Sequence, residues 1–191
     1  MPRLSLLSLP VFLLLALLQL GFMGYLIVRQ EHVVLHGTTY RFLTQSIDPR
    51  DPFRGKYIVL HFEAETFRVA TPHNWLEALP HRAEVFAHLG TNAEGYAILT
   101  GLSPTPPAGD YLPVRVSYYH SNGTVRVELP FDRYYLEETK AKPAEDALRD
   151  GRGRDLPCYA VVKVRNGRSA LVDVQVDGQS IHQWILGKME K

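Results

Sequence analysis

Apolar residues in this chain follow two patterns, first one long uninterrupted run and then short alternating segments. Residues 4–28 contain no charged side chain. A helix of that length rises about 37 Å, enough to cross a hydrocarbon core about 30 Å thick. Pro10 and Gly21 would weaken a water-exposed helix but are tolerated in a membrane span. We therefore expect residues 1–29 to form a membrane anchor, with residues 4–28 in contact with the lipid bilayer.

A cleaved signal peptide is the alternative to this anchor. Arg3 supplies the basic residue that such peptides need, but their apolar region spans only about 7–15 residues and ends at a small-x-small site. The run here is longer, and residues 24–29 offer no such site. The pattern therefore favours an uncleaved, single-pass anchor in the cytoplasmic membrane. The basic N-terminus predicts that the C-terminal part lies outside the cytoplasm.

Beyond residue 30, apolar and polar side chains alternate with a period of about two, which is typical of half-buried β-strands. The dipeptides Asn166-Gly167 and Asp177-Gly178 predict tight turns between such strands. Gly37-Thr38-Thr39 separates two further segments that resemble a hairpin. The predicted strands cover residues 33–36, 40–45, 56–63, 84–89, 97–102, 114–119, 124–129, 159–165, 170–176 and 180–185.

Two short segments predict helices instead. Residues 71–79 place Pro72 at a first helical position, and residues 142–149 carry acidic residues early and Arg149 late. The predicted fold is therefore mainly β behind one N-terminal transmembrane helix. An antiparallel or mixed sheet closes into a partial barrel or sandwich, with one or two short helices. Its length suits a single domain over residues 30–191, outside the cytoplasm.

Composition narrows the range of partners. The chain has 21 Lys and Arg against 20 Asp and Glu, without a basic stripe, which argues against nucleic acid binding.

Cys158 is the single cysteine, so the chain forms no internal disulfide and no Cys-based zinc cluster. Cys158 is most simply a buried small side chain, and an intermolecular disulfide is the alternative.

One segment carries a recognisable motif. Asp48-Pro49-Arg50-Asp51-Pro52-Phe53-Arg54-Gly55 leads into Lys56-Tyr57-Ile58-Val59-Leu60-His61-Phe62. Here the chain resembles the GDYXXLXY family of membrane-anchored proteins. Gly55, Tyr57 and Leu60 match the motif, whereas Lys56 replaces its Asp and Phe62 replaces its final Tyr. Two later stretches, Arg133-Tyr134-Tyr135-Leu136-x-Glu138 and residues 172–178, are similar to further elements of that family.

The resemblance implies an anchored, β-rich domain without an established biochemical activity. It also implies a multi-pass membrane protein as a partner, because genes of this family often neighbour one for such a protein. A near-copy at residues 109–116 keeps the Asp but lacks the motif's Leu. Pro113 within it has no N–H for a central strand, so we interpret this copy as a chance match or a structural echo.

The motif itself has a structural and a functional interpretation. Its prolines and Gly55 shape a loop into a strand, where Leu60 and Phe62 face the core and Tyr57 shares the other face with His61. Alternatively, polar side chains of the loop recognise a ligand or partner. The candidate recognition or structural residues are Asp48, Arg50, Asp51, Arg54, Gly55, Tyr57, Leu60 and Phe62.

Other candidate chemistry is less well supported. His32 and His36 have helical ligand spacing, but the intervening Val33-Val34-Leu35 favours a strand, where they would lie about 13 Å apart. A Ser/Lys hydrolase would need Ser46 as nucleophile with Lys56 or Lys163 as base, and residues 44–49 do not form such a nucleophile box. We expect no catalytic residue, no metal and no cofactor.

These observations favour an accessory or binding subunit of a cell-envelope assembly. A Ser/Lys-type hydrolase at the membrane surface is one alternative. A domain that binds an envelope ligand through Tyr57 and His61, or through the 48–54 loop, is the other.

Overall fold

The computed structural model describes residues 5–45, 57–69, 74–77, 79–80, 82–120, 122–136 and 138–189. A helix of 32 residues comes first, and short strands and three further helices follow. The elements are α1 (Ser5–His36), β1 (Thr38–Leu43), β2 (Tyr57–Val59), the 3₁₀ helix η1 (Glu63–Glu65), β3 (Thr66–Arg68), α2 (Asn74–Glu77), β4 (Glu84–Thr91), β5 (Ala97–Ser103), β6 (Tyr111–Tyr119), β7 (Thr124–Glu128), β8 (Arg133–Tyr135), α3 (Glu138–Gly153), β9 (Cys158–Arg165), β10 (Arg168–Val176), β11 (Gln179–Ser180) and α4 (Ile181–Met189).

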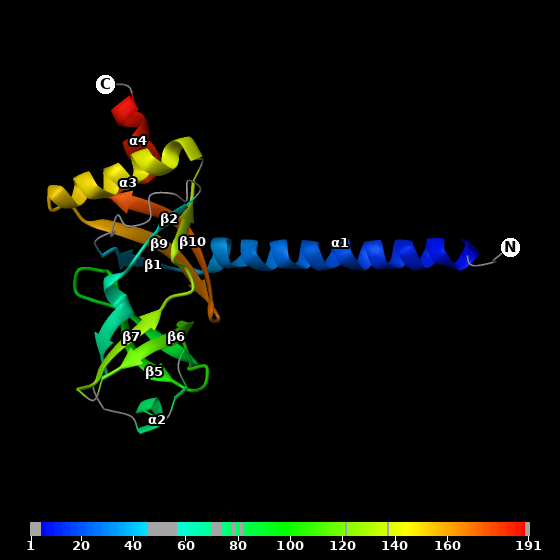
Figure 1. Cartoon of the computed structure of the whole chain (residues 1–191), viewed down its shortest axis with the longest axis horizontal. Coiled ribbons are helices and arrows are strands. Elements are labelled where there is room, and N and C mark those ends of the chain that lie inside the picture. The colour runs from blue at the N-terminus through cyan, green and yellow to red at the C-terminus, as the bar shows by residue number, and fades with distance from the viewer. Residues whose placement is uncertain are drawn as a thin grey trace.

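The described strands pair in three antiparallel sets. One sheet has the order β1-β9-β10-β11, a second has the order β3-β7-β6-β4-β5, and β2 and β8 form a separate two-stranded pair (Figure 1). Backbone hydrogen bonds extend this pairing, since the N–H of Gln45 donates to the carbonyl of His61 and that of Leu60 to Asp132. The sheets thus form a nearly closed, barrel-like arrangement, which confirms the mainly β prediction.

Side chains from both large sheets meet in one hydrophobic core. Phe42, Phe62 and Phe131 pack edge to face within it, with ring centroids 5.0–5.9 Å apart. α3 packs against α4 and lies at the end of the domain opposite the five-stranded sheet (Figure 1). Ala144, Ala147 and Leu148 of α3 are buried, at the spacing of one helical face.

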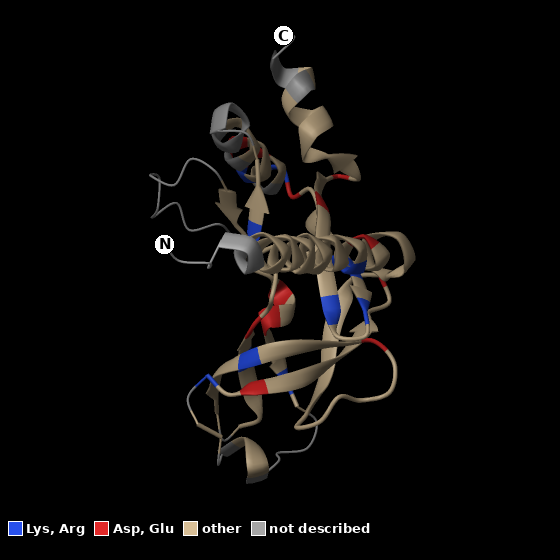
Figure 2. Cartoon of the chain, turned by 90° about the vertical axis from the view of Figure 1, so that its right-hand side faces the viewer, with Lys and Arg blue, Asp and Glu red and all other residues tan. Residues whose placement is uncertain are grey.

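Helix α1 leaves the side of the domain between these two ends (Figures 1 and 2). Its apolar side chains point outward, with Leu14 66% and Leu20 69% exposed, and it is long and apolar enough to cross a membrane. α1 ends at His36, and the N–H of the following Gly37 donates to the carbonyl of Val33 at 2.9 Å. A Cβ at this glycine would lie 2.5 Å from that carbonyl oxygen, so the tight exit into β1 needs glycine.

Two of the predicted strands are wrong. Residues 33–36 continue α1 rather than pairing in a hairpin, because the helix already formed extends by one hydrogen bond per residue and Val33 is buried. His32 and His36 are therefore on one helix face, with stacked rings 4.4 Å apart. Residues 181–185 begin α4, where Ile181 and Ile185 are buried one helical turn apart.

Most other predicted strands and both predicted turns are confirmed. Asn166 and Gly167 have φ values of 48° and 73°, as a primed two-residue hairpin turn requires. Strand β6 begins earlier than expected and includes Pro113, which pairs with Phe86 of β4. Because β7 pairs with β6 only from Arg115 onward, no neighbouring strand needs the missing N–H of Pro113.

Candidate functional site

Strand β2 covers only Tyr57–Val59 of the predicted strand 56–63, but the extended segment from Tyr57 to Phe62 keeps a buried and an accessible face. Ile58, Leu60 and Phe62 are buried, while Val59 is 38% exposed and His61 is exposed on the other side, as the alternation predicts. Tyr57 is half-buried on that other face. The rest of the motif, which includes Asp48, Arg50, Asp51, Arg54 and Gly55, lies outside the described residues, and so does Ser46 of the hydrolase hypothesis.

The three segments that carry the family resemblance come together in space. β2 pairs with β8, so that Tyr57 lies opposite Tyr135 with ring centroids 5.6 Å apart. The Arg133 guanidinium lies 5.1 Å from the centre of the Tyr57 ring, within the range of a cation–π contact. The third segment begins in β10, next to Tyr134.

Tyr134 connects β8 to that third segment. Its hydroxyl donates to Asp173 at 3.5 Å, and the Ser180 hydroxyl donates to the same carboxylate at 2.9 Å. Burial, and then the charge and hydrogen bond of Asp173, raise the pKa of Tyr134 to about 12. The phenol therefore stays protonated near neutral pH and acts as a structural donor.

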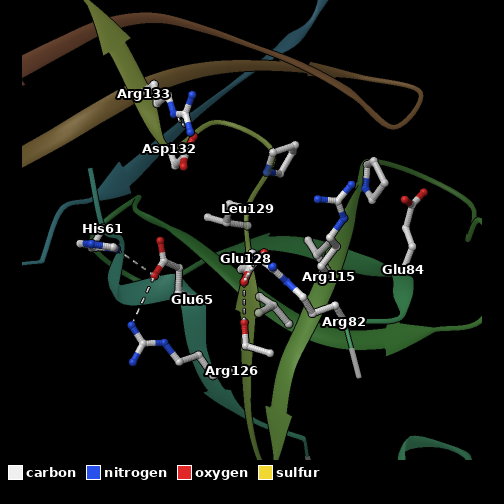
Figure 3. Close-up of a pocket in the computed structure, with 15 residues that line it drawn as sticks. His61, Glu65, Arg82, Glu84, Arg115, Arg126, Glu128, Leu129, Asp132 and Arg133 are labelled. Carbon is white, nitrogen blue, oxygen red and sulfur yellow. Dashed lines mark hydrogen bonds and ion pairs between the residues drawn. The ribbon is translucent and has the colours of Figure 1, made fainter. Parts of the chain in front are cut away.

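A polar cleft of about 760 Å³ opens beside the end of the motif strand, between η1 and the faces of β6 and β7 (Figure 3). We call it the charged cleft, because it is lined by four arginines, four carboxylates and a histidine. These are Arg82, Arg115, Arg126, Arg133, Glu65, Glu84, Glu128, Asp132 and His61. His61 is the residue that the cleft shares with the sequence motif.

Glu65 is the buried acid of the charged cleft, with 7% of its surface exposed. One of its oxygens accepts a hydrogen bond from the Phe62 N–H at 3.2 Å, and this bond caps the N-terminus of η1. The other lies 3.6 Å from His61 Nδ1 and 3.9 Å from an Arg126 nitrogen, and both side chains point toward it (Figure 3). Desolvation outweighs these interactions and raises the pKa of Glu65.

Glu128 lies at the exposed side of the charged cleft, and its pKa is shifted in the opposite direction from that of Glu65. Arg82 donates from one nitrogen to both of its oxygens, at 2.8 and 2.9 Å, and the Ser117 hydroxyl donates at 3.2 Å. The hydrogen bond from Arg82 is the main reason that the pKa of Glu128 is lowered. Arg115 lies between Glu128 and Glu84 on neighbouring strands, directly opposite each.

Among the described residues, the charged cleft does not contain the serine–lysine pair that the hydrolase hypothesis requires. Ser117, the hydroxyl side chain that lines the cleft, donates to a carboxylate and has no lysine or histidine base within hydrogen-bond distance among the described residues. Within the described ranges, no cluster of three or more His, Cys, Asp or Glu side chains has metal-site geometry. Lys163, a base of the hydrolase hypothesis, donates to Thr39 at 2.8 Å on an exposed strand.

The sequence model of the GDYXXLXY protein family matches residues 19–174, most of the chain. This chain belongs to the GDYXXLXY family. The match begins inside α1 and ends in β10, so it includes the charged cleft, the first two converging segments and the start of the third. No curated protein and no solved structure matches the chain.

Sequence reasoning missed most of the charged cleft. Glu65 had a local signal, because it stands three residues after the helix-preceding Phe62, at the position of a capping glutamate. Arg115 and Arg126 lie on outward positions of alternating strands, where charge is ordinary. Only the pairing of β4, β6 and β7 brings these side chains to one surface, and that pairing cannot be read from any one segment.

Proposed function

We propose that this chain is a membrane-anchored accessory or binding subunit of a cell-envelope assembly. In this proposal α1 is retained as a signal-anchor in the cytoplasmic membrane, and the β-rich domain works outside the cytoplasm. The apolar, outward-facing surface of α1 supports the anchor. The partner that the family resemblance implies is a multi-pass membrane protein.

The charged cleft is the observation that carries this proposal. Its opposite charges are interleaved on paired strands, and rigid strands hold their side chains at fixed spacings. A surface with both charge signs complements a polypeptide segment that also carries both signs, and such complementarity selects partners and speeds their association. An extramembrane loop of the multi-pass protein is the occupant that we propose.

Site-specific photo-crosslinking in native membranes tests the partner. A crosslinker at position 82, inside the charged cleft, should yield one discrete adduct with a multi-pass membrane protein, and a crosslinker at Ile98 on the exposed side of β5 should not. Arg126→Gln should reduce the adduct, whereas Arg154→Gln, a matched loss of one exposed arginine outside the cleft, should leave it unchanged. A folded, membrane-bound protein that gives no adduct at position 82 contradicts the proposal.

Anchoring is tested separately from partner binding. Alkaline extraction should leave the full chain in the membrane fraction, and N-terminal sequencing should find residues 4–28 still present. A reporter fused after Lys191 should be active only outside the cytoplasm. Mature protein that begins near Val28, or reporter activity in the cytoplasm, refutes the signal-anchor.

The hydrolase hypothesis is distinguished by one substitution. Ser46→Ala should leave the function of the gene intact if the chain is a binding subunit, while joint replacement of Arg50 and Arg54 should weaken partner retention. A Ser46→Ala variant that folds normally yet loses all function would favour the enzyme.

A further inference from the structure

A second surface, with three arginines along a partly apolar groove, lies where α1 meets the domain. A groove of about 450 Å³ runs between one face of α1 and the tip of the β9–β10 hairpin, and we call it the juxtamembrane groove. Tyr25, Val28 and Arg29 line it from the helix, and Arg165 and Arg168 line it from the hairpin. Figure 2 looks at this side of the molecule and shows basic positions on the strands beside the base of α1.

The charges of the juxtamembrane groove have one sign. Three arginines contribute to it, and none of the described residues that line it carries a carboxylate. Arg165 and Arg168 flank the two-residue turn and lie directly opposite each other in the strand register. Like charges in that position repel and destabilise a hairpin, and an anion between or above the two guanidinium groups would relieve that repulsion.

The groove is held in place from both sides. Val33 is 2% exposed at the base of the helix, and Gln30 donates to the Ser169 carbonyl at 3.4 Å. Arg165 donates from one nitrogen to the carbonyl of His36 at 2.9 Å, which satisfies the end of α1 and fixes the direction of its guanidinium. The helix and the hairpin therefore present their arginines at a set separation.

The position of the groove along α1 indicates the source of the anion. The uncharged run ends at Val28, and the groove extends along α1 from Tyr25 to Val33, about two helical turns. Tyrosine and arginine at the end of a membrane span are typical of the interface, where phospholipid phosphates lie. The Arg29 guanidinium lies 5.6 Å from the centre of the Tyr25 ring, which keeps both on that face.

We propose that the juxtamembrane groove binds the phosphate of an anionic phospholipid, with its acyl chains along the apolar face of α1. This inference rests on the membrane anchoring proposed above. Arg29, Arg165 and Arg168 hold the headgroup, and the bound lipid neutralises the opposed hairpin arginines. Lipid binding in turn fixes the height and tilt of the domain, and hence of the charged cleft, relative to the membrane surface.

The test uses the full chain, purified in a neutral detergent and titrated with phosphatidylglycerol while thermal unfolding is followed. Phosphatidylglycerol should raise the Tm, and phosphatidylcholine should raise it far less. Arg168→Gln and Arg29→Gln should each weaken phosphatidylglycerol binding about fivefold, the effect expected for one basic side chain near an anionic surface. Arg154→Gln, with the same charge change outside the groove, should bind as the parent protein does.

Three outcomes overturn the proposal. Equal responses to both lipids would show that no anionic headgroup is selected. Unchanged binding by both Arg168→Gln and Arg29→Gln would show that the groove is not the site. A Tm rise with inorganic phosphate that matches the lipid response and is lost in the same variants would assign the site to a free anion. Alkaline extraction of the parent chain distinguishes these failures from a failure of anchoring itself.

Discussion

The charged cleft and the juxtamembrane groove are both rich in arginine. The strand register places opposite charges side by side in the cleft but like charges side by side in the groove. In the cleft, Glu84, Arg115 and Glu128 lie side by side on β4, β6 and β7, so each charge faces an opposite one. In the groove, Arg165 faces Arg168 across the hairpin. The formal net charge of the whole chain, +1, conceals this contrast.

This difference in charge pairing indicates which of the two regions is electrostatically favourable without a ligand. Opposite-charge pairs across strands each stabilise a sheet by about 0.2–1 kcal/mol, whereas like-charge pairs destabilise it. The opposed charges of the charged cleft are therefore favourable without a ligand, and in our proposal a partner would exchange ion pairs with them. The juxtamembrane groove retains a repulsion that an external anion relieves, which is why we assign a lipid to the groove and a polypeptide to the cleft.

The largest effect is expected when the core beneath the charged cleft is disturbed. Leu60 is fully buried, and its N–H donates to the Asp132 carbonyl at the cleft margin. Leu60→Ala should reduce the free energy of unfolding by about 2–5 kcal/mol, because it removes packed methyl groups and leaves a cavity. Urea unfolding of the domain, followed by circular dichroism, measures this loss.

Val59 provides the matched control for Leu60. It precedes Leu60 in the chain but points to the other face and is 38% exposed. Val59→Ala should cost less than about 1 kcal/mol, because an exposed side chain loses little burial. Comparable losses for the two variants would mean that the facing of the motif strand is wrong.

The alternation of buried and exposed side chains also explains how much of the fold could be predicted from the sequence. A period of two identified Leu60 and Phe62 as core, and Asn166-Gly167 fixed the β9–β10 hairpin, because both signals depend on neighbouring residues. The C-terminal helix also had a local signal, since Ile181 and Ile185 are one helical turn apart, but the preceding turn favoured another strand. The strand prediction for residues 33–36 was wrong because the adjoining helix overrides the β propensity of Val33 and Val34.

The residues of the two proposed sites could be predicted from the sequence much less well than the fold. Arg115 and Glu128 are 13 positions apart in the chain yet lie opposite each other, and Arg29 reaches the groove only because the β9–β10 hairpin returns to α1. Such neighbours depend on strand order and register across the whole domain. The motif reaches the charged cleft only through His61, whereas most of the charges that define the cleft come from later segments of the chain.

Two glutamates of the charged cleft should respond to pH with opposite signs. Burial raises the pKa of Glu65 above its ordinary 4.5, so the folded state holds the proton more tightly than the unfolded chain does. Its contribution to stability is present below about pH 4.5 and is lost as the pH rises through the folded-state pKa. Glu65→Gln should therefore flatten a decline of stability in that window, as measured by urea unfolding at a series of pH values.

Glu128 serves as the control for Glu65 in the same titration. Arg82 lowers the pKa of Glu128 below 4.5, so its contribution is present above that value and is lost as the pH falls through the folded-state pKa. The effect is small, because solvent screens an exposed ion pair, about 0–1 kcal/mol. If Glu65→Gln and Glu128→Gln changed the pH profile in the same direction, the proposed contrast between a buried and an exposed acid would be wrong.

The smallest effects test the comparison between cleft and groove directly. Without lipid, Arg115→Gln should destabilise the domain by about 0.2–1 kcal/mol for each opposite-charge pair that it removes. Arg168→Gln should instead leave stability unchanged or raise it by a similar amount, because it relieves the repulsion of Arg165. Both effects should shrink as salt is added. A clear loss of stability in Arg168→Gln without lipid would mean that the opposed arginines are favourable on their own, and the groove would then need no anion.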